Sequence, residues 1–465
     1  MKALPKDIFK NEPFYWGTAT SAFQIEGSPL ADDAVASDWY KTSHMPTMID
    51  GGTTADIACD HYRRWEEDVR IMRDMGLNSY RFSVAWSRIY PASGKVNQKG
   101  LDFYNRLIDR LCESGITPFL TLFHWDLPIW LDDLGGWVSD DSPKYFGEYS
   151  STLFKHFGDR VKHWITLNEP FVYYHSYING WHWPFRTNAY SDMLKSFHHE
   201  IEGHQLAVDI YKKHYDGKIG ATLSYNLIHP ASNSQKDVAA AKLADGVRNR
   251  WFQDRIFRGE YPQDVLEMYG QNVPKECFEN RKLDASSLPD FIGLNYYAPI
   301  YIKFDKNEEV FHFASPNDEF ELQPSINYDA TGLTEMVKRF DRDYGPIEIF
   351  ITENGYLEYG SALEGKDPTE DYGRIEYLSD HLHQVKLCRE QGYPVHGYFH
   401  WSLLDNFEWR WGMNRMFGLI YVDPITKNRI PKKSAYWYKK YIESSRIEDR
   451  QQNIAIRNSK VLLKP

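Results

Sequence analysis

The sequence has 465 residues, and its 54 basic and 65 acidic side chains give a net charge of −11. This mildly acidic balance gives no general attraction to phosphate, so nucleic acid is excluded as a partner. Charged residues make up 26% of the chain, its mean hydropathy is −0.59 and no run of about 20 apolar residues occurs, so the composition predicts a globular protein and excludes a membrane span.

No apolar signal region precedes Phe14, so we expect a chain that is not exported and a cytoplasmic location. From Phe14 onward, β-branched and aromatic runs alternate with segments of helical apolar spacing. Strands are predicted over residues 14–23, 79–83, 117–122, 161–167, 218–224, 291–294, 346–350 with a continuation to Glu353, and 395–400. Helices are predicted over residues 60–75, 99–114, 143–157, 191–215, 237–257, 333–344, 371–391 and 434–442.

Strands that alternate with helices predict a parallel sheet, and eight such units favour a closed barrel over an open sheet. The predicted fold class is therefore α/β, a (β/α)8 TIM barrel with long βα loops. Length alone would also allow two or three domains. Because no repeat or linker interrupts the series, we expect residues 1–465 to form a single domain, with a core at about residues 14–443. The role of the extension at 444–465 is left open: it could cover the bottom of the barrel, join a subunit interface or be partly mobile.

Chemistry in such barrels lies at the carboxyl ends of the strands. Polar and aromatic residues fall at or just past these ends: Gln24, Arg81, His124, Asn168, Glu169, Asn295, Tyr297, Glu353 and Trp401. The four cysteines lie far apart without a Cys-x-x-Cys unit, which favours free buried thiols over the alternative of a disulfide: Cys59, Cys112, Cys277 and Cys388.

Two glutamates are the first candidates for chemistry. Glu169 follows Asn168 after the fourth predicted strand, and Glu353 precedes Asn354 at the end of the seventh. Either alone could pair with an arginine or cap a helix. Together at one barrel mouth, they indicate the carboxylate pair that acid/base hydrolysis of a glycosidic bond requires.

The neighbours of the two glutamates predict different roles. Arg81 and Tyr297 are expected to reach Glu353 across the barrel mouth, and a cation with a phenol favours an ionised carboxylate. A drier environment would let Glu169 keep its proton near neutral pH. We therefore expect Glu353 to be the nucleophile and Glu169 the general acid and base.

Other residues at the mouth suit the binding of sugar hydroxyls and sugar rings. His124 is a candidate hydroxyl ligand, with a core histidine as the alternative, and the amide of Gln24 can donate to and accept from vicinal hydroxyls. Two interpretations are open for Trp401, Glu408 and Trp409. Either the rings only pack within a loop, or they form a platform for a sugar ring beside a carboxylate that binds hydroxyls. No histidine pair or His/Asp/Glu trio has ligand spacing, so we expect no metal and no cofactor.

At these residues the chain resembles glycoside hydrolase family 1, the retaining β-glycosidases, from about Phe14 to Tyr441. The resemblance is carried by seven motifs in order: Phe23-Gln24-Ile25-Glu26-Gly27, Tyr80-Arg81-Phe82-Ser83, His124-Trp125-Asp126-Leu127-Pro128, Thr166-Leu167-Asn168-Glu169-Pro170, Asn295-Tyr296-Tyr297, Ile351-Thr352-Glu353-Asn354-Gly355 and Asp405-Asn406-Phe407-Glu408-Trp409.

The resemblance implies a (β/α)8 barrel and hydrolysis by double displacement, with carboxyl groups about 5–5.5 Å apart. It implies Glu169 as acid/base, Glu353 as nucleophile and two supporting sets. The residues that would bind the glycone are Gln24, His124, Asn168, Trp401, Glu408 and Trp409. The residues that would support the nucleophile are Asn295 and Tyr297. The substrate implied is a small β-glucoside or oligosaccharide, with β-galactosides and β-fucosides as side substrates.

Two finer choices follow from the resemblance. Members that act on 6-phosphorylated sugars carry Ser in the place of Glu408, with Lys and Tyr near the places of Arg415 and Phe417. A carboxylate would repel phosphate, so a non-phosphorylated glycone is expected. Thioglucosidases of the family replace the acid/base Glu by Gln, so Glu169 favours ordinary O-glycosides.

Departures from the family pattern gather on the aglycone side. Phe171 stands where the family has Trp, and Trp183 lies in a loop that lacks the usual Gly-x-x-Ala-Pro-Gly ending. Trp411 and Met413 also stand in unusual places, and Phe417 is a further aglycone candidate. These residues are either a differently packed loop or an aromatic acceptor site that changes leaving-group choice or favours transfer to sugars and alcohols.

Two other classes remain as alternatives at this point. A catalytically silent sugar-binding barrel would lack one of the two glutamates. An isomerase or aldolase would need a catalytic lysine or a metal, and no candidate stands at a strand end. The sequence leaves the oligomeric state open, a homo-oligomer included.

Overall fold

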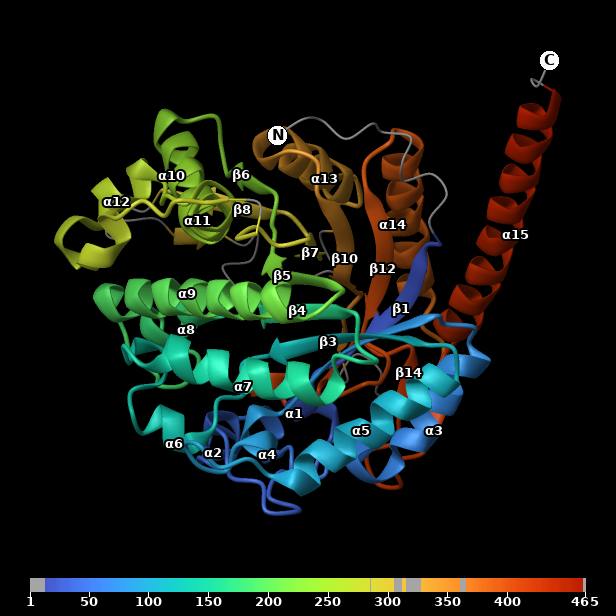
Figure 1. Ribbon diagram of the computed structural model, residues 1–465, viewed down its shortest axis with the longest axis horizontal. Coiled ribbons are helices and arrows are strands. Elements are labelled where there is room, and N and C mark those ends of the chain that lie inside the picture. The colour runs from blue at the N-terminus through green and yellow to red at the C-terminus, as the bar shows by residue number, and fades with distance from the viewer. Residues whose placement is uncertain (1–12, 285, 305–311, 315–327, 360–364, 463–465) are drawn as a thin grey trace.

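The computed structural model describes residues 13–284, 286–304, 312–314, 328–359 and 365–462. Within them, eight parallel strands close into a barrel, which confirms the predicted fold class (Figure 1). β1 pairs with β2 on one side and with β12 on the other, and this contact closes the ring. The barrel strands are β1 Tyr15–Ala19, β2 Ser79–Ser83, β3 Thr117–Phe123, β4 His163–Asn168, β5 Lys218–Ser224, β7 Phe291–Asn295, β10 Glu348–Asn354 and β12 Val395–Trp401.

The major helices surround the barrel (Figure 1). They are α3 His61–Asp74, α5 Gln98–Glu113, α7 Ser142–Phe157, α9 Tyr190–His214, α10 Gln235–Asp245 with α11 Trp251–Arg258, α13 Thr331–Tyr344, α14 Tyr372–Glu390 and α15 Lys433–Leu462. Short helices lie in the loops: α1 Ala22–Ile25, α2 Asp38–Ser43, α4 Trp86–Ile89, α6 Ile129–Asp132, α8 Tyr173–Tyr177 and α12 Gln263–Tyr269. No helix in the described part of the chain is long and apolar enough to cross a membrane.

Three small sheets lie in the loops of the barrel within the described residues. They are β6 Ile228–Pro230 with β8 Ile300–Lys303 and β9 His312–Ala314, β11 Glu358–Tyr359 with β13 Arg415–Met416, and β14 Ile420–Val422 with β15 Arg429–Pro431. The β11–β13 pair joins the loop after β10 to the loop after β12. These two loops therefore hold each other above the barrel mouth.

The first predicted strand, residues 14–23, was too long. β1 ends at Ala19, and the chain then turns across the barrel mouth and forms α1. The backbone amide of Thr20 donates to the carbonyl of Arg81, and that of Ala22 donates to Ser83 Oγ at 2.7 Å. These contacts with β2 bend the chain, so Gln24 lies on a helical turn and not at the end of a strand.

The predicted helix 237–257 is interrupted by a π-helical turn at Gly246–Arg250 between α10 and α11. Asn249 Nδ2 donates to Asp245 Oδ1 at 2.7 Å and to the carbonyl of Asn226 at 3.0 Å. A Cβ on Gly246 would lie 2.4 Å from Val265 Cγ2, so the turn packs closely against α12. The wider turn changes the direction in which Arg248 leaves the helix.

The predicted end of the last helix at residue 442 was also wrong. α15 continues as one helix to Leu462 and runs away from the barrel (Figure 1). The segment is polar but rich in residues with good helix propensity. Apolar spacing therefore marked only the part of α15 that packs on the barrel.

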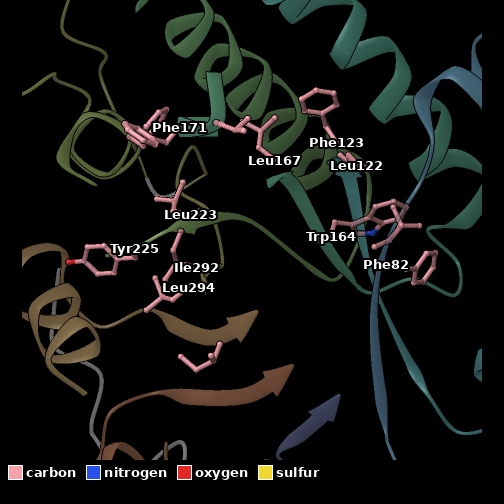
Figure 2. Packing of buried hydrophobic residues seen from close by; sticks show 14 of the residues in the cluster. Phe82, Leu122, Phe123, Trp164, Leu167, Phe171, Leu223, Tyr225, Ile292 and Leu294 are labelled. Atoms are coloured by element: carbon pink, nitrogen blue, oxygen red, sulfur yellow. The ribbon is translucent and has the colours of Figure 1, made fainter. Parts of the chain in front are cut away.

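Two hydrophobic layers hold the barrel together. The interior is filled mainly by aromatic side chains: Ala19, Phe119, Ile165, Phe291, Tyr297, Phe350, Phe399 and Trp401. A larger cluster fills the space between the strands and the helices, and Figure 2 shows part of it, from Phe82 and Trp164 to Ile292 and Leu294. Because the interior is a packed core, only its carboxyl end is left for polar side chains.

The four cysteines are free, and three of them, Cys59, Cys277 and Cys388, are buried. Cys112 is exposed, so the expectation of a buried thiol was wrong at this position. It lies near the end of α5, on the face of that helix that points away from the barrel.

Candidate active site

Glu169 and Glu353 lie at the carboxyl ends of β4 and β10. Glu353 is part of β10, whereas Glu169 follows β4 in a left-handed backbone conformation with φ 47° and ψ 63°. Its amide donates to the carbonyl of Thr222 on β5 at 2.9 Å. A non-glycine residue held in this sparsely populated region is typical of functional sites.

The carboxylate of Glu353 accepts two hydrogen bonds from strong donors. Arg81 Nη1 lies 2.7 Å from Oε1, and the Tyr297 hydroxyl lies 2.8 Å from Oε2. Burial raises the pKa of Glu353, while the charge of Arg81 and the bonds from Tyr297 and Arg81 lower it. Both donors favour the ionised form of this carboxyl.

The carboxyl group of Glu169 has a weaker set of partners. Asn295 Nδ2 donates to its Oε1 at 2.7 Å. Burial, and then the charge of Glu353, raise the pKa of Glu169 to about 7. The two carboxyl groups therefore differ in their donors, since Glu353 accepts from a guanidinium and a phenol and Glu169 from an amide.

Asn168 joins these groups to the other side of the barrel. Its Oδ1 accepts from Arg81 Nη2 at 2.6 Å and from Asn295 at 3.1 Å, and its Nδ2 donates to His124 Nε2 at 3.2 Å. Burial holds the pKa of His124 well below its usual value, so the ring is neutral. With Nε2 accepting, the ring hydrogen is on Nδ1, which is buried without a partner among the described residues and can donate to a bound hydroxyl.

Glu408 and Gln24 meet at the side of the mouth formed by the loops after β12 and β1. Gln24 Nε2 donates to Glu408 Oε2 at 2.9 Å and to Asn406 Oδ1 at 3.1 Å. Burial, and then the charge of Glu353, raise the pKa of Glu408 to about 8. Glu408 therefore belongs to the same electrostatic cluster as the two strand-end glutamates.

Aromatic rings surround the same side. The ring of His124 is nearly parallel to the rings of Trp401 and Trp409, with centroids 5.8 and 6.1 Å away. Trp409 in turn packs on Phe23, Trp39 and Trp125. These contacts fix flat apolar faces beside the polar groups of Gln24 and Glu408.

The structure thus brings ten of the predicted residues together at one end of the barrel, with Arg81 beneath them: Gln24, His124, Asn168, Glu169, Asn295, Tyr297, Glu353, Trp401, Glu408 and Trp409. Among the described residues, no group of three His, Cys, Asp or Glu side chains could hold a metal ion.

The three aglycone candidates lie in different surroundings. Phe171 is buried and stacks on Tyr174, and Phe417 packs edge-on against Tyr297. Trp183 is half-buried, and its Nε1 donates to Asp132 at 2.7 Å. Phe417 therefore lies beside the nucleophile candidate, whereas Phe171 and Trp183 belong to the loop after β4.

Two contacts of the site were missed by reasoning from the sequence. Thr352 Oγ1 donates to Asn295 Oδ1 at 2.8 Å, which orients the amide that contacts Glu169. Arg248 lies close enough to Glu169 to lower its pKa, although it was predicted only as part of a helix. The sequence signal for Arg248 was a polar Arg-Asn-Arg run in the middle of an expected apolar helix.

Comparisons with known proteins cover most of the chain. The model of a family described as glycosyl hydrolase family 1 matches residues 6–447. β-Glucosidase A of Thermotoga maritima is 42% identical over 445 residues, which cover 94% of this chain and 98% of that protein. A 1,4-β-D-glucan glucohydrolase of Thermotoga neapolitana is 43% identical over 448 residues, with 94% and 99% covered. The structure of β-glucosidase from Thermotoga maritima in complex with deoxynojirimycin has a TM-score of 0.85 at 40% identity, and covers 95% of this chain and 99% of that one.

Proposed function

Since the chain belongs to glycosyl hydrolase family 1, we propose that it is a retaining β-glucosidase that hydrolyses terminal, non-reducing β-D-glucosides through a covalent glycosyl-enzyme intermediate. Relatives at more than 40% identity are named β-glucosidase or β-glucan glucohydrolase, and a similar structure holds a sugar mimic. The proposed substrate is accordingly a small β-glycoside or an oligosaccharide.

The observation that carries the mechanism is the difference between the two glutamates. Glu353 accepts from a guanidinium and a phenol, while Glu169 accepts from one amide. A nucleophile must be ionised, and a general acid must hold a proton. We therefore assign Glu353 as the nucleophile and Glu169 as the acid and base.

In the first step, a Glu353 oxygen attacks the anomeric carbon while Glu169 gives its proton to the glycosidic oxygen. The bond between the anomeric carbon and that oxygen breaks, and the aglycone leaves as an alcohol. In the second step, Glu169 takes a proton from water, the water oxygen attacks the anomeric carbon, and the ester bond to Glu353 breaks. Two inversions give a product with the configuration of the substrate.

The groups beside Glu353 are proposed to bind the glycone. Gln24 and Glu408 would hold vicinal hydroxyls, His124 would donate from Nδ1, and Trp401 and Trp409 would provide the flat faces on which a sugar ring packs. The carboxyl of Glu408 would repel a 6-phosphate, which supports a non-phosphorylated glycone. β-Galactosides and β-fucosides are proposed as side substrates, which a rate comparison of the three 4-nitrophenyl glycosides would test.

Replacement of each glutamate by glycine in the presence of azide tests the two roles separately. Glu353→Gly should abolish turnover, and azide should restore it with a product of inverted, α configuration, because azide enters from the face that the carboxylate occupied. Glu169→Gly should instead form the β-glycosyl azide from the trapped intermediate. If only the Glu169 variant gave the α-azide, the two roles would have to be exchanged. If neither variant lost activity, the proposed function would fail.

A further inference from the structure

The loop after β4 follows directly on Glu169 and contains no acidic side chain. Between Glu169 and Asp192 the chain has no Asp or Glu, although acidic residues exceed basic ones over the whole protein. The same segment carries a dense series of aromatic rings: Phe171, Tyr173, Tyr174, Tyr177, Trp181, Trp183, Phe185 and Tyr190. This stretch is therefore both aromatic and free of negative charge, beside the proposed proton donor.

Three cations from other loops lie over rings of this segment. The guanidinium carbon of Arg248 is 4.5 Å from the ring of Phe171, Lys41 Nζ is 3.9 Å from that of Trp183, and the guanidinium carbon of Arg410 is 5.7 Å from that of Trp181. The three cations come from different parts of the chain, after β5, β1 and β12. Their convergence on one loop gives it a positive charge that its own sequence does not predict.

None of the three cations has a carboxylate within ion-pair distance among the described residues. Arg248 is 8% exposed and donates only to neutral groups, Asn226 Oδ1 at 2.6 Å and Ser224 Oγ at 3.2 Å. Its Nη1 has no partner in the described residues. Since a buried guanidinium normally pairs with an anion, Arg248 retains the capacity to bind one.

The two other cations show the same lack of a carboxylate partner. Arg410 donates to the carbonyls of Met48 and Trp181, both at 3.1 Å. Lys41 is exposed, and the carboxyl that affects it is Asp132. Asp132 accepts the hydrogen bond of Trp183, and burial raises its pKa. The three cations therefore lack a direct carboxylate partner, and the carboxyl groups of Glu169 and Asp50 act on Arg248 and Arg410 only from beyond ion-pair distance.

The position of these cations identifies the part of the substrate that they would meet. In the ring of strands, β4 and β5 lie opposite β12 and β1, whose loops carry the proposed glycone-binding residues Gln24 and Glu408. Arg248 is anchored to Ser224, the last residue of β5. A glycone on the β1 and β12 side places its leaving group on the β4 and β5 side, because the acid/base glutamate stands between the two.

We propose that the β4 loop, with Arg248, Lys41 and Arg410, forms an acceptor site for an aglycone that carries a negative charge on a ring. The inference rests on the proposed glycosidase function and extends it to the leaving group. The rings supply stacking faces and the cations supply the counter-charge for a carboxylate or sulfate. Such an aglycone is either an aromatic acid or the uronic acid end of an acidic oligosaccharide.

The test compares two aryl glucosides of nearly the same shape, 4-carboxyphenyl and 4-carbamoylphenyl β-D-glucoside. kcat/KM is measured on both for the unaltered enzyme and for Arg248→Gln, Lys41→Gln and Arg410→Gln. Lys338→Gln on the outer helix α13 is the matched control, since it removes a cation far from the mouth. Any effect of Arg248 on the proton of Glu169 changes both substrates equally, so the ratio of the two values isolates recognition of the charge.

Arg248→Gln should lower kcat/KM on the carboxylate roughly tenfold to a hundredfold and change it on the amide by much less, because a buried bond to a charged group is lost. Lys41→Gln should lower it only about threefold, since Lys41 is exposed. With the unaltered enzyme, added salt should raise KM for the carboxylate and leave KM for the amide unchanged.

Equal losses on both substrates for Arg248→Gln would overturn the inference and leave the glycosidase intact. If Arg248→Gln does not fold, the test rests on Lys41→Gln, Arg410→Gln and the salt dependence. The inference is then overturned if none of these three affects the carboxylate substrate more than the amide. A second pair, cellobiose and its glucuronic acid analogue, separates the two sources. Preference for the acid in this pair indicates an oligosaccharide, and preference only in the aryl pair indicates an aromatic acid. If the unaltered enzyme hydrolysed neither of the two aryl glucosides, the proposed glycosidase function itself would fail.

Discussion

Burial raises the pKa of Glu353 while Arg81 and Tyr297 lower it, and removal of the phenol should show how much this donor contributes. Tyr297→Phe deletes the hydrogen bond at 2.8 Å, which lowers the pKa of Glu353. The pKa of Glu353 should rise, so the acidic limb of kcat/KM should move to higher pH. The rate should fall by roughly tenfold to a hundredfold, the usual range for a bond to a charged group.

The measurement is the pH profile of kcat/KM with 4-nitrophenyl β-glucoside. Tyr296→Phe is the control, because that hydroxyl donates to the carbonyl of Asp329 and not to either glutamate. An acidic limb that stayed in place in Tyr297→Phe would mean that Arg81 alone sets the charge of Glu353.

The protonation of Glu169 should determine the basic limb of the same pH profile of kcat/KM. Burial and the charge of Glu353 raise the pKa of Glu169 to about 7. Since the acid must hold its proton to protonate the leaving group, kcat/KM should fall as pH rises through about 7. Glu169→Ala, assayed with 2,4-dinitrophenyl β-glucoside, whose leaving group needs no proton, should lose this limb. If the basic limb persisted in Glu169→Ala, it would be assigned to Glu408, whose pKa is raised to about 8.

At the scale of single residues, strand ends could be located from sequence because apolar runs of β-branched and aromatic residues stop abruptly at polar side chains such as Asn168 and Glu353. The left-handed backbone of Glu169 could not be predicted, since it depends on the bond from its amide to Thr222. Arg248 was missed for a similar reason. Its direction is set by the π-helical turn, which depends on contacts with Asn226 and α12 that no local pattern encodes.

At the scale of elements, the chain after β10 passes very close to the end of β12 at Gly355. A Cβ on Gly355 would lie 1.9 Å from the carbonyl oxygen of Trp401. Gly355→Ala should therefore push the end of β12 away from β10, at a cost of about 1–3 kcal/mol for overpacking. Because Trp401 and the loop to Glu408 follow this end, kcat/KM should fall along with the melting temperature.

Gly94→Ala is the control for the glycine substitution. Its Cβ would meet open space, so only the strain of a positive φ of 68° remains. It should lower the melting temperature slightly and leave kcat/KM unchanged. Equal behaviour of the two variants would show that the contact between Gly355 and Trp401 does not position the site.

The boundaries of elements were predictable where packing and local pattern agree, as in β5, predicted and found at residues 218–224. They failed where a segment is stabilised by something other than an apolar face. α15 continues beyond its predicted end through a polar segment, and β1 ends early because the backbone amides of Thr20 and Ala22 donate to β2.

At the scale of the whole molecule, the barrel must join the two ends of the chain, and a buried ion pair contributes to this closure. Asp68 on α3 accepts from Arg429 on β15 through Nε at 2.8 Å and Nη2 at 2.9 Å, and it also contacts His61 at 2.8 Å. The two partners are 361 residues apart, and both side chains are fully buried. The contact therefore ties the first third of the barrel to the hairpin that precedes α15.

Removal of Asp68 should destabilise the fold strongly, because Arg429 would be left as a buried, unpaired charge. Asp68→Asn should cost about 3–5 kcal/mol, whereas the double variant Asp68→Leu with Arg429→Met should recover much of this loss. The surface pair of Asp159 and Arg160 is the control, since Asp159→Asn should change the melting temperature very little. A double variant no more stable than Asp68→Asn would show that the pair itself, and not the orphaned charge, holds the ends together.

The same pair predicts how stability depends on pH. Although burial raises the pKa of Asp68, the bonds from His61 and Arg429 dominate and lower it below its usual value. A carboxyl with a lowered pKa contributes stability that is present above its unfolded pKa of about 3.9 and is lost as pH falls toward the folded value. The difference in melting temperature between the unaltered enzyme and Asp68→Asn should therefore be constant from pH 5 to neutrality, within about one degree, and shrink below about pH 4. A difference that persisted undiminished at pH 3 would mean that Asp68 stays ionised there, or that it acts through packing and not through its charge.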